Sequence, residues 1–295
     1  MKSFIKILTK YPANRYIDYS FVLVERWFTY GLISHYNTEN AIINPCKFAH
    51  DESIIFFATY REVTMEINAD FSQRILINTE QLKWLDSPML GVSRRPLDRV
   101  GDEVARATSL VRYAPNSNFS PHTHTGGEEI IVLEGVFQDE HGDFPAGSYI
   151  RNPPTSKHRP RSEHGCIIFV KLWQFDPHDR VHVRLNSKLM QTIPHNHLPG
   201  VRVASLYNDN VEDVAIFDLD AHISLELPTN NGAEIFVLEG ELTEGPDTLV
   251  KHSWLRVPID SKLAIHTGAT GAKIWIKQGH LRRVSSEVLH MQSAY

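Results

Sequence analysis

The strongest constraint on the fold is a phrase that the chain contains twice. Residues 127–135 read GEEIIVLEG, and residues 232–240 read GAEIFVLEG, 105 positions later. Three further pairs recur in the same order, namely Arg151 with Arg256, Pro153 with Pro258 and, after a one-residue gap, Lys171 with Lys277. A unit of about 100 residues is too long for a solenoid repeat. The chain is therefore expected to contain two copies of one domain.

Short β-rich runs separated by glycine and proline make up both copies. The first contains TSLVRYAP, EEIIVLEG and CIIFVKLWQF, and the second contains VRVASLYN, EIFVLEG and AKIWIKQG. Many short strands between such turns are typical of sandwiches and barrels. We therefore expect an all-β protein.

Four residues of the first copy have the chemistry of a metal site. His122 and His124 lie two positions apart, so an extended strand points both imidazoles to the same side. Glu128 follows a flexible TGG turn, and His158 comes after a predicted hairpin and the rigid sequence NPP. Three neutral imidazoles and one carboxylate suit a divalent ion such as Zn, Fe, Mn or Ni. The alternative is an empty or sugar-binding barrel in which these polar side chains face solvent.

The spacing of these residues resembles two motifs of the cupin superfamily. The motif G-x5-H-x-H-x3,4-E-x6-G is matched by His122, His124, Glu128 and Gly135, with Asn116 in place of the first glycine. The motif G-x5-P-x-G-x2-H-x3-N is matched by Gly147, Pro153 and His158, with Thr155 and Ser162 in place of its second glycine and its asparagine. The resemblance implies two tandem cupin barrels, that is, jelly rolls of the double-stranded β-helix type.

Within the cupins, residues 66–180 resemble the ChrR-like proteins through segments such as DFSQR, RATSLVRYAP and HTHTGGEEIIVLEGVFQDEHGDFPAGSYIRNPP. This group includes the cupin domain of zinc-dependent anti-sigma factors and stand-alone relatives. The resemblance implies that His122, His124, Glu128 and His158 bind zinc or a similar metal. It does not imply sigma-factor binding, because the separate domain that binds sigma factors has a His-x3-Cys-x2-Cys site. Residues 1–64 contain a single cysteine, Cys46 in the sequence CKFAH, so the His-x3-Cys-x2-Cys spacing is absent.

The domain order follows from the repeat and the resemblance. We expect an N-terminal extension at 1–64, a metal-binding cupin at 65–180, a linker at 181–200, a second, degenerate cupin at 201–285 and a tail at 286–295. The extension has no counterpart in either copy, and we expect it to be partly helical, around residues 19–34, or poorly packed.

The choice between Glu128 and Glu129 as ligand rests on spacing and on the second copy. Both motif distances select Glu128. The second copy keeps Glu234 as the partner of Glu129 but has Ala233 in place of Glu128. A carboxylate that is retained where no metal is expected is better explained by a structural role, so Glu129 is interpreted as structural.

The second copy has lost every predicted ligand. Leu227, Thr229 and Leu263 replace His122, His124 and His158. Other histidines of the second half, which are His222, His252 and His266, do not fall at ligand positions and are interpreted as surface residues. His195 and His197 lie in the proline-rich connector. We therefore expect one metal-binding barrel and one silent barrel.

Two functional hypotheses from different classes fit this pattern. The first is a metal-dependent, dioxygenase-like enzyme acting on a small molecule, and the second is a regulatory sensor without turnover that contacts a protein partner. A purely structural bicupin ranks last, because it would not need a ligand set. Four basic residues near His158, namely Arg151, Lys157, Arg159 and Arg161, could attract an anionic substrate, although a solvated basic loop is the simpler interpretation. Cys166 is either a redox group or, as we favour, an inert core thiol.

Composition limits the partners. The formal net charge of −5 leaves no surplus of cations for nucleic acid. No apolar run reaches the roughly 18 residues of a membrane span, and no signal peptide is evident, so we expect a cytoplasmic protein without membrane contact. The two cysteines argue against a disulfide framework. Exposed strand edges would allow a homodimer.

Overall fold

The computed structural model describes residues 42–46, 55–59, 65–102 and 104–285. The chain divides into two compact units, Met1–Val63 and Thr64–Tyr295. In the first unit, β1 (Ile42–Cys46) pairs with β2 (Ile55–Thr59) in antiparallel orientation. The helix expected around residues 19–34 and the tail expected at 286–295 lie outside the described residues.

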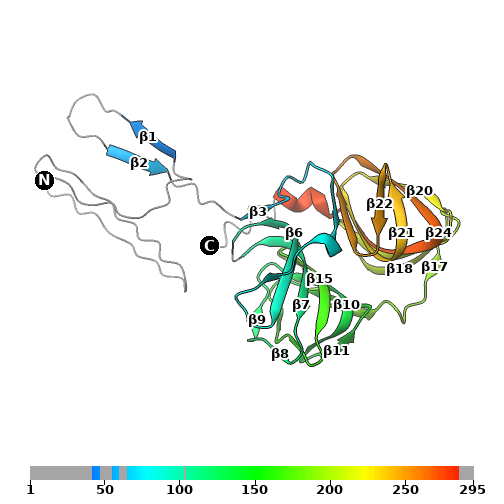
Figure 1. The fold of residues 1–295 in the computed structure, drawn as a ribbon, viewed down its shortest axis with the longest axis horizontal. Helices are drawn as coiled ribbons and strands as arrows, with labels where there is room; N and C mark the ends of the chain where they lie inside the picture. The colour runs from blue at the N-terminus through cyan, green and yellow to red at the C-terminus, as the bar shows by residue number, and fades with distance from the viewer. Residues whose placement is uncertain (1–41, 47–54, 60–64, 103, 286–295) are drawn as a thin grey trace, which may run out of the picture. The chain divides into compact units, whose positions relative to one another are not determined.

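The second unit contains two β-barrels, as the repeat predicts (Figure 1). The larger sheet of the first barrel follows the order β16-β12-β10-β15-β7-β6-β3. Its strands are β3 (Glu66–Ile67), β5 (Leu85–Asp86), β6 (Val92–Val100), β7 (Arg106–Tyr113), β8 (Ser117–Asn118), β10 (Glu128–Asp139), β11 (Gly142–Pro145), β12 (Ser148–Asn152), β14 (Arg161–Ser162), β15 (Cys166–Leu172) and β16 (Val183–Asn186). A separate two-stranded sheet pairs β9 (His122–Thr123) with β13 (Lys157–His158).

The second barrel repeats this arrangement in the order β17-β18-β19-β24-β21-β23-β4. Its strands are β4 (Ile75–Asn78), β17 (Ile193–Pro194), β18 (Val201–Asn208), β19 (Asp213–Leu219), β20 (Ser224–Thr229), β21 (Ala233–Glu244), β22 (Asp247–Val250), β23 (Ser253–Val257) and β24 (Ser261–Gln278). Two 3-10 turns, η2 (Thr79–Gln81) and η3 (His280–Arg283), flank β4 and β24. In the described residues, no helix has the length and apolar character that a membrane crossing requires.

The repeated phrase ends in glycine because both copies bend at the same point. In β10 and in β21, the register with the neighbouring strand shifts just before Gly135 and Gly240. Both glycines have positive φ, 71° and 72°. A Cβ atom would lie 2.1 Å from the Gly165 carbonyl oxygen in the first barrel and 2.3 Å from the Gly271 oxygen in the second. Only glycine fits such a bulge, so VLEG is a backbone requirement of this fold.

Each barrel is completed by a strand that begins the other repeat. β4 lies between β3 and β5 of the first barrel in sequence but pairs with β23 of the second, placing Asn78 opposite Ser253. β16 precedes the second barrel but pairs with β12 of the first, placing Asn186 opposite Ser148. The two pairings have the same register, so the exchange is reciprocal. Part of the stretch interpreted as a linker, 181–200, thus belongs to a sheet.

Strand alternation separates the barrel interior from the surface between the barrels. On β10, Ile130 and Val132 pack inside the first barrel, together with Phe137. The intervening Ile131 packs in a second cluster that contains residues of both barrels, including Trp254 and Trp275. A third apolar cluster fills the second barrel. The face that Glu128 shares with Ile130 and Val132 therefore points inward, as strand parity predicts.

Two buried ion pairs connect the barrels, and the repeat relates one to the other. Lys171 Nζ donates to Glu234 Oε2 at 2.7 Å, and Lys277 Nζ donates to Glu129 Oε2 at 2.6 Å. The four side chains are at most 2% exposed. In the repeat, Glu129 corresponds to Glu234 and Lys171 to Lys277. The retained glutamate therefore has the structural role that the sequence suggested for it.

Candidate metal centre

The small sheet formed by β9 and β13 brings distant histidines together. His122 lies directly opposite His158 across this pair. The backbone of His124 is fixed by the turn before β13, because its N–H donates to the Ser156 carbonyl at 2.9 Å and its own carbonyl accepts from Thr155 N–H at 2.8 Å. Backbone hydrogen bonds thus set the spacing of the three imidazoles.

Two positions where the chain departs from the cupin motifs keep the backbone conformation that glycine normally provides. Asn116 has φ of 61° and Thr155 has φ of 74°, both in the left-handed region. Asparagine tolerates this region well, whereas a β-branched threonine is strained there. The strained residue is also the one whose N–H donates to the His124 carbonyl, so it helps to fix the backbone of that histidine.

The three imidazoles form a compact cluster at one side of the first barrel. One ring nitrogen from each of His122, His124 and His158 lies within 4.8 Å of the others, and the ring centroids are 4.6 to 4.9 Å apart. His158 and His124 are buried, whereas His122 is exposed. The cluster could hold a metal ion, and its exposed side would admit a small ligand. It is the one such group of histidine, cysteine and acidic side chains found among the described residues.

Glu128 lies against two of these histidines. Its Oε2 atom is 3.4 Å from His124 Nε2 and 3.3 Å from His158 Nε2. Both Nε2 atoms are buried and make no hydrogen bond. Buried polar atoms are rarely left without a partner, and a cation coordinated by both nitrogens and the carboxylate would satisfy them. The residues present therefore fit a metal ion, and the structure brings all four predicted residues into one place.

The surroundings tune the protonation of two histidines in opposite directions. Burial lowers the pKa of His124, although the nearby Glu128 charge opposes this effect. Burial also disfavours charge on His158, but its hydrogen bond to Asp139 and the charge of Glu128 outweigh that effect and raise the pKa of His158. Metal ions bind the neutral imidazole, so protons compete with an ion more strongly at His158 than at His124.

Two polar residues next to the cluster were not predicted from the sequence. The Oδ2 atom of Asp139 lies 3.2 Å from His158 Nδ1, and Asn152 Nδ2 donates to Glu128 Oε2 at 3.3 Å. Asp139 stands in the sequence DEHGD, which indicated only a turn. Asn152 lies opposite Glu128 in the β10–β12 register, so its parity was the signal that could have placed it at the site.

The basic residues near His158 do not form one group. Arg151 is buried and pairs with Asp179 and Glu212, so it is not available to an anionic substrate, and that part of the hypothesis is wrong. The reason is strand parity, since Arg151 lies opposite Glu129 rather than Glu128. Lys157, Arg159 and Arg161 are exposed, which agrees with a solvated loop.

Cys166 is a core residue, as favoured from the sequence. Its side chain is buried in the apolar cluster of the first barrel. Burial raises the pKa of the Cys166 thiol to about 11, so the thiolate that redox chemistry needs is scarce near neutral pH.

The second barrel is filled where the first has its histidines. Leu227, Leu263 and Ala233, which replace His122, His158 and Glu128, are buried in its apolar cluster. Thr229 replaces His124 and donates its hydroxyl to the Ser261 carbonyl. None of the four side chains is free to bind an ion.

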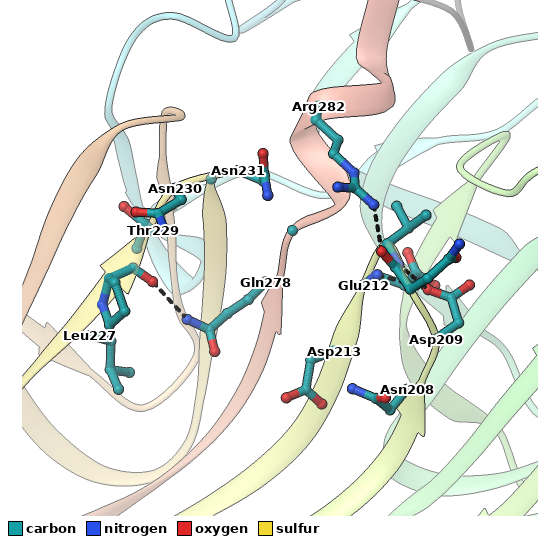
Figure 2. Close-up of a pocket in the computed structure, with 15 residues that line it drawn as sticks. Asn208, Asp209, Glu212, Asp213, Leu227, Thr229, Asn230, Asn231, Gln278 and Arg282 are labelled. Atoms are coloured by element: carbon teal, nitrogen blue, oxygen red, sulfur yellow. Dashed lines mark hydrogen bonds between the residues drawn. The ribbon is translucent and has the colours of Figure 1, made fainter.

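A cavity of about 350 Å³ opens at the rim of the second barrel (Figure 2). It is bordered by the turn at 208–213, the segment 227–232 and the end of β24. The Gln278 amide donates to the Pro228 carbonyl, and Arg282 donates to the Asn210 carbonyl. Figure 2 shows Gln278 and Arg282 at this cavity, each with its hydrogen bond as a dashed line. No histidine lines this cavity, so it is separate from the candidate metal centre.

Comparison with known proteins agrees with the fold. Residues 72–176 match the family model of the ChrR cupin-like domain. No curated protein matches the chain in sequence. Several solved structures share the fold at identities too low to transfer function.

Three of these structures illustrate the likeness. A candidate dioxygenase from Nostoc punctiforme is 17% identical, with a TM-score of 0.59 over 71% of this chain and 84% of that one. Escherichia coli YlbA is 15% identical, with a TM-score of 0.56 over 74% and 97%. A bacterial pirin, Escherichia coli YhhW in complex with nickel(II), is 11% identical, with a TM-score of 0.52 over 70% and 98%. The chain therefore has a two-barrel cupin fold, and its first barrel matches the ChrR cupin-like domain over residues 72–176.

Proposed function

We propose that the first barrel binds one divalent metal ion through His122, His124, Glu128 and His158 and acts as a dioxygenase-like enzyme on a small molecule. The observation that carries the proposal is the pair of buried, unpartnered Nε2 atoms of His124 and His158 that face Glu128. An ion bound there would act as a Lewis acid or redox centre with positions left for a substrate. The Nostoc structure, described as a candidate dioxygenase, is consistent with this class.

The chain's own residues would shape the substrate site in two ways. One aromatic side chain lies next to the cluster, because the Phe137 ring is centred 6.0 Å from that of His158, and Phe137 itself packs against Tyr113 and Phe144. Such an apolar wall on the inner side of the site would favour a substrate with an apolar part. Exposed His122 marks the side from which a small molecule would enter.

Zinc is our first expectation for the ion, because the first barrel resembles a domain of zinc-dependent proteins. The ligand set also suits iron, manganese and nickel. Metal analysis of protein purified without added metal, followed by oxygen-uptake assays on the iron-loaded form, tests both parts. Substrate-stimulated oxygen consumption supports the enzyme, and its absence over a wide panel of small aromatic and aliphatic acids speaks against it.

A sensor without turnover is the alternative, and one observation favours it. The adjacent residues Glu128 and Glu129 lie on opposite faces of β10, and Glu129 accepts from Lys277 of the second barrel. A metal or ligand held by Glu128 is therefore one residue from the interface between the barrels. Tightly held zinc, no oxygen uptake and capture of a regulatory protein only by the metal-loaded form would favour the sensor.

The ligand assignment has its own test. His124→Ala is expected to abolish binding of the ion, because it removes a buried imidazole from the cluster. His266→Ala is the matched control, since His266 is an exposed histidine of the second barrel. Equal metal content in both variants and in the wild type would refute the assignment.

A further inference from the structure

We infer that Asp139 and Asn152 are positioning residues that hold His158 and Glu128 in the geometry needed for an ion. The inference rests on the proposed metal site, since it assigns roles toward the same four side chains. Neither residue belongs to the ligand set predicted from the sequence.

Asp139 determines which nitrogen of His158 faces the cluster. Its side chain is fully buried, and Oδ1 accepts from the His141 backbone N–H at 2.7 Å while Oδ2 lies 3.2 Å from His158 Nδ1. An ionised carboxylate only accepts hydrogen bonds, so Nδ1 carries the proton. The lone pair of His158 is then on Nε2, the atom that faces Glu128. Asp139 therefore fixes both the tautomer and the ring orientation that an ion requires.

Asn152 performs the corresponding task for Glu128. It is 2% exposed, and its amide donates to Glu128 Oε2, the same oxygen that lies next to both histidines. This is the hydrogen bond that the structure gives to the Asn152 side chain. A buried amide at this position would restrict rotation of the carboxylate.

The second barrel shows what becomes of these positions when the ligands are absent. Glu128 and Asn152 face each other across β10 and β12, and at the matching register of the second barrel Ala233 faces Val257. The supporting amide has been lost together with its carboxylate. At the position of Asp139 stands Glu244, which pairs with Arg74 at 2.6 Å, while Leu263 replaces His158. Without a histidine to orient, the acidic residue makes a different contact.

Two substitutions at Asp139 separate a positioning role from a merely structural one. Asp139→Ala removes the acceptor and leaves His158 free to choose its tautomer. Asp139→Asn keeps the shape but offers a single acceptor oxygen, which the fixed donor of His141 takes. The amide NH₂ then faces His158 and forces Nδ1 to accept, which places the proton on Nε2 and blocks ligation. The conservative asparagine is therefore expected to be worse for metal binding than alanine.

The measurement is zinc affinity of the full chain, by competition with a chromophoric chelator, together with the absorption spectrum of the cobalt(II) form, which reports the ligand set. We expect affinity to fall about tenfold in Asp139→Ala and about a hundredfold in Asp139→Asn, within the range known for residues behind metal ligands. Asn152→Val, which copies Val257, is expected to cost about tenfold. Glu244→Gln, the matched change in the second barrel, should leave affinity and spectrum unchanged.

The outcomes distinguish this inference from the proposal on which it rests. If wild type binds no zinc and His158→Ala behaves like it, the metal site itself is wrong. If wild type binds one zinc and His158→Ala loses it, but the Asp139 variants bind as wild type does, only the positioning role is wrong. A larger loss in Asp139→Ala than in Asp139→Asn would also overturn it, because a packing role predicts that order. Thermal unfolding of the metal-free variants verifies that each one is folded.

Discussion

The ion pair between Lys171 and Glu234 should stabilise the two-barrel unit by several kcal/mol, and Lys171→Met tests this. Lys171 Nζ also donates to Thr108 at 2.9 Å, and Glu234 also accepts from Trp254 at 3.0 Å and contacts His280 at 2.8 Å. Burial alone would raise the pKa of Glu234, but the charges of Lys171 and His280 hold it well below its ordinary value. The substitution would therefore leave a buried carboxylate without its main counter-charge.

The expected loss can be bounded from these contacts. Removing one partner of a buried ion pair typically costs about 3 to 5 kcal/mol. Glu234 keeps two donors, which places the expectation near the lower end, at about 3 kcal/mol. For a unit of this size each kcal/mol lowers the melting temperature by roughly 2 to 4 °C, so a decrease of about 10 °C is expected.

Equilibrium unfolding in urea, followed by tryptophan fluorescence, measures this loss because Trp254 lies at the ion pair. The double variant Lys171→Met with Glu234→Gln is expected to be more stable than the single variant, since it removes the uncompensated charge and keeps an acceptor for Trp254. A loss below about 1 kcal/mol in the single variant, or a double variant less stable than the single one, would refute the reasoning.

Two further predictions follow from the same structure. Burial lowers the pKa of His280 from 6.5 to about 4, so between these values the unfolded chain binds a proton that the folded chain excludes. The free energy of unfolding should thus fall by about 3 kcal/mol as the pH drops through this window. His280→Gln should flatten that dependence. The same slope of unfolding free energy against pH in His280→Gln and in the wild type would contradict the prediction. Zinc at about one hundred times its dissociation constant should stabilise the wild type by about 2.7 kcal/mol and leave His124→Ala unaffected; equal melting shifts in calorimetry would contradict this.

The barrel architecture and the ligand cluster were accessible from the sequence because both depend on local rules. Motif spacing selected His122, His124, Glu128 and His158, and the structure gathers these side chains together. Strand alternation, which is a property of the backbone itself, also separated Glu128 from its neighbour Glu129.

What the sequence did not reveal depends on contacts between distant segments. Asp139 is 19 residues from His158, and nothing in DEHGD indicates that the end of a long strand returns to a histidine. Arg151 was grouped with the basic loop because it lies near His158 in sequence, although its strand turns it toward the other barrel. The pairing of β4 with the sheet of the second barrel could not be predicted from its sequence, because four β-forming residues carry no information about which sheet edge they join.

The reciprocal use of β4 and β16 has a consequence for how such a chain can evolve. β4 of the first repeat completes the second barrel, and the equivalent strand β16 of the second repeat completes the first barrel. Such reciprocal contacts are typical of a two-fold symmetric homodimer, here joined in one polypeptide. Neither barrel is built only from strands of its own repeat, so deletion of one repeat would remove an edge strand from the sheet of the other barrel. Substitutions can therefore remove the histidine and glutamate positions from the second barrel one by one, but the barrel itself is retained because the sheet of the barrel that carries the histidine cluster depends on it.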